Sequence, residues 1–217
     1  MKKSVLIIAI GFALVACKDK PVETVDMQNT SESETTAIEE VTAQAIAPVA
    51  APAFNKEFDL QGIHFVVEAT NNGSINTLKI TPSGLSIVND VITREIDGTV
   101  TNAEVADINA DGSPEIYVWV SAAGSGSYAT PIGYSANNKK SLSEIYFPPI
   151  SEDKVNSKGY MGHDEFAVLE GIVAQRFPIY NQADTNAKPT GKMRQLQYKL
   201  TPGEAGWVMK LDQSIEF

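Results

Sequence analysis

Short runs in which apolar and polar residues partly alternate follow one another from Phe54 to the end of the chain. The runs are FDLQGIHFVVEAT, INTLKITPSG, GLSIVND, ITREIDG, TVTNAEVADI, PEIYVWVS, TPIGYSAN, LSEIYFP, EFAVLEG, IVAQRFPIY, MRQLQYKL and GWVMKLDQ. Groups typical of turns separate them, such as NNGS, TPSG, DG, ADGSP, SANN and TPGEAG. No long segment has helical periodicity. The pattern therefore predicts an all-β fold, an antiparallel β-sandwich.

The first 53 residues differ from this pattern. Residues 1–16 pass from charged to apolar to small side chains, which predicts a secretory signal. The segment LVAC, ending at Cys17, resembles the lipobox of bacterial lipoproteins and implies cleavage before Cys17 and a lipid on its thiol; the alternative is an ordinary signal peptide with an accidental cysteine. Residues 17–53 lack aromatic residues, so we expect a disordered acidic tether behind the lipidated cysteine. Residues 54–217 are expected to form a single domain.

Charge and cysteine content narrow the classes of partner. The formal net charge is −10, and removal of a signal containing two lysines would leave about −12. Such a chain is a poor candidate for binding nucleic acid and suits a cationic partner. Cys17 is the only cysteine, so the domain is expected to fold without a disulfide.

The run DINADGSPE is a candidate calcium loop. Oxygen-bearing side chains occupy its positions 1, 3, 5 and 9, with glycine at position 6: Asp107, Asn109, Asp111 and Glu115. This spacing resembles short calcium loops in which oxygens surround a hard cation, but Val118 stands where an EF-hand carries a bidentate glutamate. The alternative is a turn whose Asp and Asn side chains bond their own backbone. Calcium is the only cofactor that the sequence leaves open.

Two histidines raise the question of catalysis. His64 lies in a strand pattern, whereas His163 lies in the glycine-flanked run YMGHDEF. With Cys17 lipidated, they do not form a zinc site. Ser125 and Ser127 do not lie in the G-x-S-x-G elbow of a serine hydrolase. These residues therefore favour neither a zinc enzyme nor a serine hydrolase.

The run GSGSYAT, residues 124–130, follows the strongest strand pattern of the chain, and its glycines predict a flexible loop rich in hydroxyl groups. Its S-G-x-Y motif is Ser125, Gly126, Ser127 and Tyr128. Together with EVADINADGSPEIYVWVS, GYSANNKKSLSEIYFP, GYMGHDEFAVLEG and RQLQYKLTPGEAGWV, it resembles the periplasmic inhibitors of invertebrate-type lysozyme over about residues 54–217.

The resemblance implies a β-sandwich with an inserted functional loop that enters the substrate cleft of an i-type lysozyme and protects peptidoglycan. Such an inhibitor is not an enzyme, because it blocks the cleft and converts no substrate. Ser125 and Tyr128 match the family's loop residues, and Ser127 is the free position. The resemblance also implies a periplasmic location. The lipobox predicts in addition a membrane anchor. Because Lys18 rather than aspartate follows Cys17, we expect this anchor to lie in the outer membrane. A homodimer is left open, as is the alternative function of a non-catalytic calcium-binding surface module.

Overall fold

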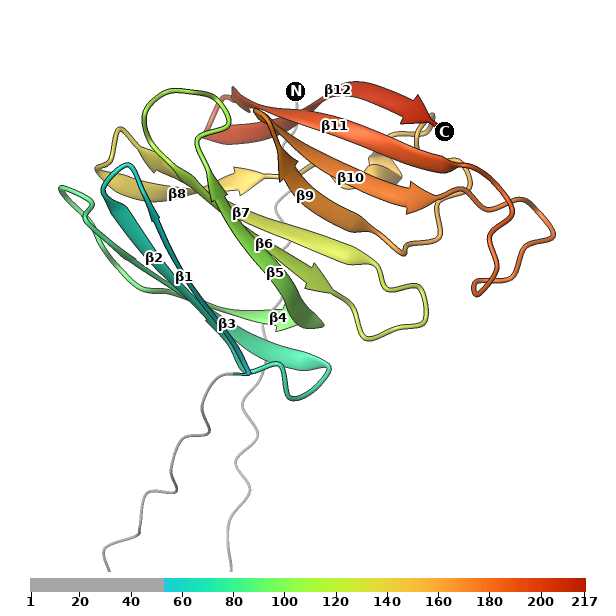
Figure 1. Ribbon diagram of the computed structural model, residues 1–217, viewed down its shortest axis with the longest axis horizontal. Helices are drawn as coiled ribbons and strands as arrows, with labels where there is room; N and C mark the ends of the chain where they lie inside the picture. The colour runs from blue at the N-terminus through green and yellow to red at the C-terminus, as the bar shows by residue number, and fades with distance from the viewer. Residues whose placement is uncertain (1–52) are drawn as a thin grey trace, which may run out of the picture. The chain divides into compact units, whose positions relative to one another are not determined.

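The computed structural model describes residues 53–217, and strands make up most of this part of the chain (Figure 1). A four-stranded sheet has the order β1 (Phe54–Leu60), β2 (Ile63–Ala69), β3 (Ile75–Ser83) and β4 (Ile92–Asp97). An eight-stranded sheet has the order β5 (Thr99–Ala106), β6 (Glu115–Ser121), β7 (Ala129–Asn137), β8 (Ser141–Tyr146), β12 (Trp207–Glu216), β11 (Met193–Pro202), β10 (Ile172–Pro178) and β9 (Glu165–Leu169). A 3₁₀ turn spans Ile150–Glu152. Among these residues no helix could span a membrane.

The prediction of an all-β sandwich is confirmed. The four-stranded sheet packs on one face of β5, β6 and β7, and its strand β2 alternates strictly between buried and half-buried positions. Phe65 and Val67 of β2 meet Ile116 and Val118 of β6 in this first core. The alternation predicted from the sequence thus places one apolar face of each sheet against the other. Cys17 and the tether expected at residues 17–53 lie outside the described residues, except for Ala53.

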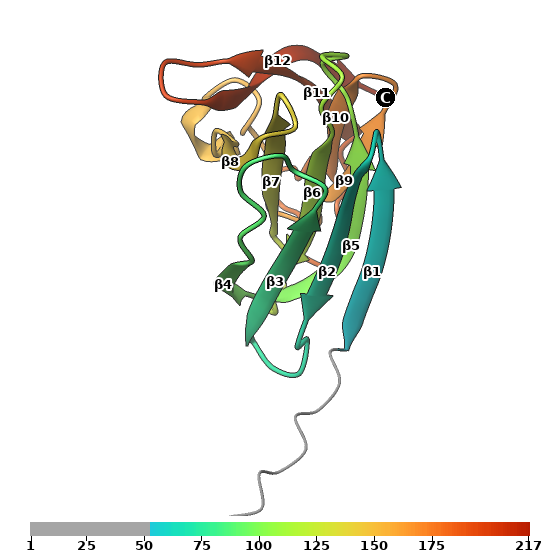
Figure 2. The same ribbon diagram turned by 90° about the vertical axis from the view of Figure 1, so that its left-hand side faces the viewer.

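The eight-stranded sheet also encloses a second core on its opposite face. Tyr117 and Trp119 of β6 pack there with Phe177 of β10 and Leu196 of β11, although these strands lie far apart in the sheet order. The sheet must therefore curve until its two halves face each other, as Figure 2 shows. Every residue of β6 from Glu115 to Val120 is buried, because this strand has one core on each side.

Three local features differ from the sequence prediction. The sheets are not antiparallel throughout, because β12 pairs with β8 in parallel over two residue pairs after the chain has passed through β9–β11. The run FDLQGIHFVVEAT is a hairpin, since Gln61 and Gly62 have positive φ values of 54° and 84° and form the turn between β1 and β2. The run GLSIVND forms no strand apart from its surroundings; residues 84–91 are an irregular connection held to the backbone of Lys139 and Lys140.

Candidate functional site

The GSGSYAT loop connects β6, which contributes to both cores, to β7, which contributes to the first. The backbone N–H of Ala122 donates to the carbonyl of Tyr128 at 2.9 Å and closes the loop at its base. Within the loop, the N–H of Ser127 donates to the carbonyl of Gly124 at 3.0 Å, and Ser127 has a positive φ of 42°. These bonds form a compact turn whose tip is residues 124–127.

The side chains of the loop differ in exposure. Ser125 is exposed and Tyr128 is 46% exposed, whereas Gly126 is buried and Ser127 is half-buried. Within residues 53–217, the hydroxyl groups of Ser125 and Tyr128 make no hydrogen bond; the bond that Ser125 accepts goes to its backbone carbonyl. Two hydroxyl groups are thus free to bond a partner, and one of them is at the end of an aromatic ring.

The loop is held by segments distant in the sequence. The N–H of His163 donates to the carbonyl of Gly126 at 2.6 Å, and Nδ2 of Asn186 donates to the carbonyl of Ser125 at 2.6 Å. Gly162, at φ +86°, lies so close that a Cβ there would be 2.1 Å from the carbonyl oxygen of Gly126. The prediction of a flexible loop is therefore not supported, because the backbone of the loop is anchored at its tip as well as at its base.

An aromatic chain supports Tyr128 from below. Its ring makes an edge-to-face contact with Tyr160, with the ring centroids 5.6 Å apart, and Tyr160 makes a similar contact with the buried Phe177 at 4.8 Å. On the other side, the Tyr128 ring covers Gly126, where an added Cβ would lie 2.4 Å from Cε2 of the ring. Gly126 thus provides the space that the Tyr128 ring occupies.

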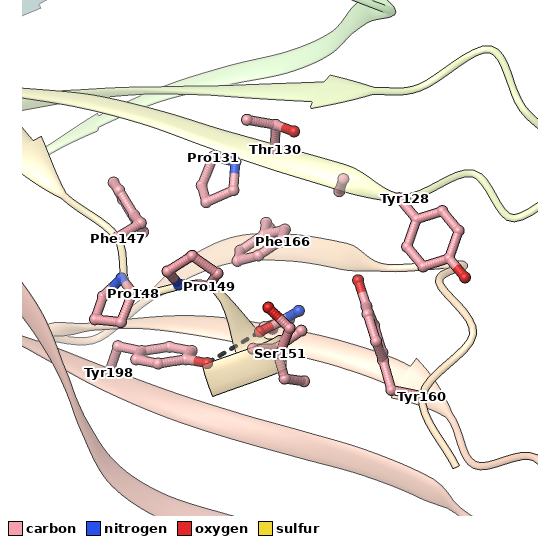
Figure 3. A pocket seen from close by; sticks show the side chains of 13 residues that line it. Tyr128, Thr130, Pro131, Phe147, Pro148, Pro149, Ser151, Tyr160, Phe166 and Tyr198 are labelled. Atoms are coloured by element: carbon pink, nitrogen blue, oxygen red, sulfur yellow. Dashed lines mark hydrogen bonds between the residues drawn. The ribbon is translucent and has the colours of Figure 1, made fainter. Parts of the chain in front are cut away.

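A groove of about 460 Å³ opens beside Tyr128, and Figure 3 shows the side chains around it. Its lining is mostly aromatic and proline: Tyr128, Pro131, Phe147, Pro148, Pro149, Tyr160, Phe166 and Tyr198, with Ala129, Thr130, Ile150, Ser151 and Gln175. Tyr128 thus belongs both to the exposed loop and to the wall of this groove.

Sequence reasoning identified the loop but missed the residues that hold it. Tyr160, Asp164 and Asn186 lie 32 to 61 positions further along the chain than the residues they contact, Tyr128, Ala129 and Ser125. Only the glycine-flanked run YMGHDEF drew attention to this region, and it did so through His163. The contacts are set by the curvature of the eight-stranded sheet, which no local pattern shows.

His163 does not form a catalytic pair with the loop serines. Its ring stacks on Tyr180, with centroids 6.2 Å apart, and its Nε2 is buried without a hydrogen-bond partner among residues 53–217. No hydrogen bond joins it to Ser125 or Ser127 in this part of the chain. The residue acts on the loop through its backbone N–H.

The candidate calcium loop brings three carboxyl groups together. One oxygen from each of Asp107, Asp111 and Glu115 lies within 4.8 Å of the other two. Asp107 and Asp111 also accept backbone N–H groups, as in the turn alternative: Asp107 Oδ1 accepts from Asp111 N at 3.0 Å, and Asp111 Oδ1 accepts from Ser113 N at 2.8 Å. The amide nitrogen of Asn109 donates to Asp111 Oδ2 at 3.0 Å, and its amide oxygen accepts from Asp111 N at 3.1 Å.

Glu115 is the buried member of this cluster. Its carboxyl accepts from the N–H of Ile108 at 3.0 Å and from the hydroxyl of Ser135 at 3.2 Å. Burial, with a smaller contribution from the nearby charges of Asp107 and Asp111, raises the pKa of Glu115 to about 7. The oxygens of these residues are close enough to one another to coordinate a single cation. The hydrogen bonds of the turn are also formed when no cation is bound.

Part of this chain is similar to a known protein family. Residues 83–157 match the family model described as periplasmic lysozyme inhibitor of I-type lysozyme. Comparison with curated proteins and with solved structures gives no match. The matched segment is roughly a third of the chain and runs from the end of β3 past β8, so it contains the candidate calcium loop and the GSGSYAT loop but not the segment around Asp164.

The resemblance expected over residues 54–217 is confirmed for this shorter segment. The description of the matching family is that of a periplasmic inhibitor of I-type lysozyme. Residues 83–157, which include the Ser125-Gly126-Ser127-Tyr128 loop, are thus similar to the family of periplasmic inhibitors of I-type lysozyme.

Proposed function

We propose that this protein inhibits i-type lysozymes by inserting the loop of residues 124–128 into the lysozyme's substrate cleft. The observation that carries the proposal is an exposed, anchored loop that presents the hydroxyl groups of Ser125 and Tyr128 within the family-matched segment. Rigidity matters because a loop that is already ordered loses less conformational entropy on binding.

The two side chains suit the chemistry of a lysozyme cleft. Such a cleft holds two carboxyl groups that act on a glycosidic bond, beside subsites shaped for sugar rings. The Ser125 hydroxyl can donate a hydrogen bond to a carboxyl group, and the Tyr128 ring has the flat, amphipathic form that a sugar subsite accepts. The net negative charge of the chain would favour encounter with a cationic lysozyme.

Alanine substitutions in the loop test this proposal. Ser125→Ala and Tyr128→Ala should each weaken inhibition. An aromatic side chain that becomes buried in an interface commonly contributes about 2 kcal/mol to binding, roughly thirtyfold in the inhibition constant. Ser127→Ala, at the free motif position, and Tyr146→Ala, which removes an exposed tyrosine from β8, are matched controls expected to change little. Unchanged inhibition by both loop variants would reject the loop mechanism.

A second candidate function is calcium binding at Asp107, Asp111 and Glu115, favoured by the close approach of their oxygens. A cation would offset the negative charges of Asp107 and Asp111, which otherwise raise the pKa of Glu115. Calcium added to chelator-treated protein at about 100 times the dissociation constant should then stabilise the fold by about 3 kcal/mol. Asp107→Asn should abolish this shift. An identical unfolding midpoint with calcium and with EDTA would reject the site.

The membrane anchor belongs to the same proposal. We infer from the sequence alone that Cys17 carries a lipid, that residues 17–53 tether the domain, and that the anchor lies in the outer membrane. Cys17→Ser should move the protein from the membrane fraction to the soluble periplasmic fraction. A wild-type protein that is already soluble would contradict the anchor. Whether the inhibitor is a homodimer is tested by its mass in solution.

A further inference from the structure

A half-buried carboxyl group, that of Asp164, lies next to the base of the loop. Asp164 immediately precedes β9, and its Oδ2 accepts from the N–H of Ala129 at 3.1 Å and from the hydroxyl of Tyr160 at 2.6 Å. Its Oδ1 accepts from Nε2 of Gln175 at 2.6 Å. One side chain thus joins the start of β7, the segment before β9, and β10.

Asp164 reaches Tyr128 by two routes. Ala129 is the next residue in the chain, so the bond to its N–H fixes the backbone at the point where the loop enters β7. The second route passes through Tyr160, whose hydroxyl is held by Asp164 and whose ring supports the ring of Tyr128. The contact of Tyr160 with the buried Phe177 fixes the far side of the same ring.

The carboxyl group has no cationic partner among residues 53–217. Burial raises the pKa of Asp164, while the hydrogen bonds from Tyr160, Gln175 and Ala129 act against this rise. Partial burial of a carboxylate without a counterion costs free energy, and the three hydrogen-bond donors offset this cost. Removal of the carboxylate would leave Tyr160 and Gln175 without their acceptor.

We propose that Asp164 is a positioning residue that sets the orientation of Tyr128 for lysozyme binding. This inference rests on the proposed function, since it assigns Asp164 a role only through the binding surface of Tyr128. A purely structural role would change stability alone. A positioning role changes inhibition, and it does so only while Tyr128 is present.

The test compares Asp164→Ala with a conservative variant and with a matched control. At a temperature where all variants are folded, Asp164→Ala should weaken inhibition of an i-type lysozyme about tenfold. Asp164→Asn should retain most of the wild-type inhibition. Its amide oxygen can accept from the N–H of Ala129 and from the hydroxyl of Tyr160, and Gln175 can rotate its amide so that its oxygen accepts from the new amide N–H. The control is Glu104→Ala, since the hydrogen bonds that Glu104 accepts within residues 53–217 come from Trp119 and Val168, which lie outside the loop. Glu104→Ala should lower stability without weakening inhibition.

A double-mutant cycle separates the possible outcomes. In the Tyr128→Ala background, Asp164→Ala should add less than a threefold further loss. If Tyr128→Ala weakens inhibition and Asp164→Ala does not, or if the two losses are additive, the positioning role is wrong while the proposed function stands. If Tyr128→Ala has no effect, the loop mechanism itself fails and the positioning role fails with it.

Tyr160→Phe keeps the test decisive if Asp164→Ala does not fold. This variant removes only the hydroxyl that donates a hydrogen bond to Asp164, and it retains the ring that packs on Tyr128. It should weaken inhibition several-fold in a fully folded protein. Inhibition equal to that of the wild type would overturn the proposed route through Tyr160.

Discussion

At the scale of single residues, the glycines of the loop have different physical roles. A Cβ on Gly124 would meet nothing within 4 Å, whereas a Cβ on Gly126 would lie 2.4 Å from the Tyr128 ring. The sequence shows two equivalent glycines in GSGSYAT, and only the packing distinguishes them.

We predict that Gly126→Ala displaces the Tyr128 ring and that Gly124→Ala does not. The displaced ring would lose its edge contact with Tyr160, so the ring-proton shifts of Tyr128 in an NMR spectrum of the free protein should change. The spectrum of Gly124→Ala should keep these shifts. Equal spectra for both variants would show that Gly126 does not provide the space for the ring.

Glu115 gives a prediction for pH. Its pKa is near 4.5 in the unfolded chain and about 7 in the folded one, mainly because of burial. The folded state therefore holds a proton that the unfolded state releases, so stability should fall as pH rises from 4.5 to 7, by up to about 3 kcal/mol.

The measurement is urea unfolding with EDTA present at several pH values. Glu115→Gln is the matched variant, because an amide can still accept from Ile108 and donate to Ser135. It should flatten the dependence between pH 4.5 and 7. A wild type whose stability rises through this range would contradict the assignment.

At the scale of elements, Gly98 is the point where the chain leaves one sheet for the other. The sequence Asp97-Gly98 is typical of a hairpin turn, yet β4 and β5 belong to different sheets. Gly98 has φ +119°, and a Cβ there would lie 2.2 Å from the carbonyl oxygen of Ser121. The close approach of two backbones, rather than a tight hairpin, is what requires glycine here.

Gly98→Ala should therefore destabilise the fold more than conformational strain alone would. The control is Gly112→Ala, since Gly112 also has a positive φ, +83°, but open space around its Cβ position. We expect a loss of about 1 kcal/mol for the control and more than about 2 kcal/mol for Gly98→Ala, measured by urea unfolding. Equal losses would mean that the contact with Ser121 is unimportant.

Much of the strand content could be predicted from the sequence, because alternation and turn residues are local signals. The opposite faces of Tyr117 and Ile116 in β6 follow directly from the two-residue period. The hairpin around TPGEAG likewise joins β11 to β12. The break at Gln61-Gly62 was hidden, because glutamine is not a typical turn residue.

At the scale of the whole described domain, β6 belongs to both cores, and the GSGSYAT loop leaves it directly. The second core depends on pairing of β8 with β12 and on approach of β5 to β9, where Glu104 accepts from the N–H of Val168. These contacts join residues about 60 positions apart. Sequence periodicity carries no information on them, so the anchoring of the loop could not be predicted although the loop itself could.

The central claim is that this molecule inhibits i-type lysozymes through its anchored loop. The most direct measurement is a titration of the purified protein against an i-type and a chicken-type lysozyme, following lysis of cell-wall suspensions. The account predicts stoichiometric loss of the i-type activity while the chicken-type activity is spared. Full i-type activity in the presence of an excess of folded protein would contradict it.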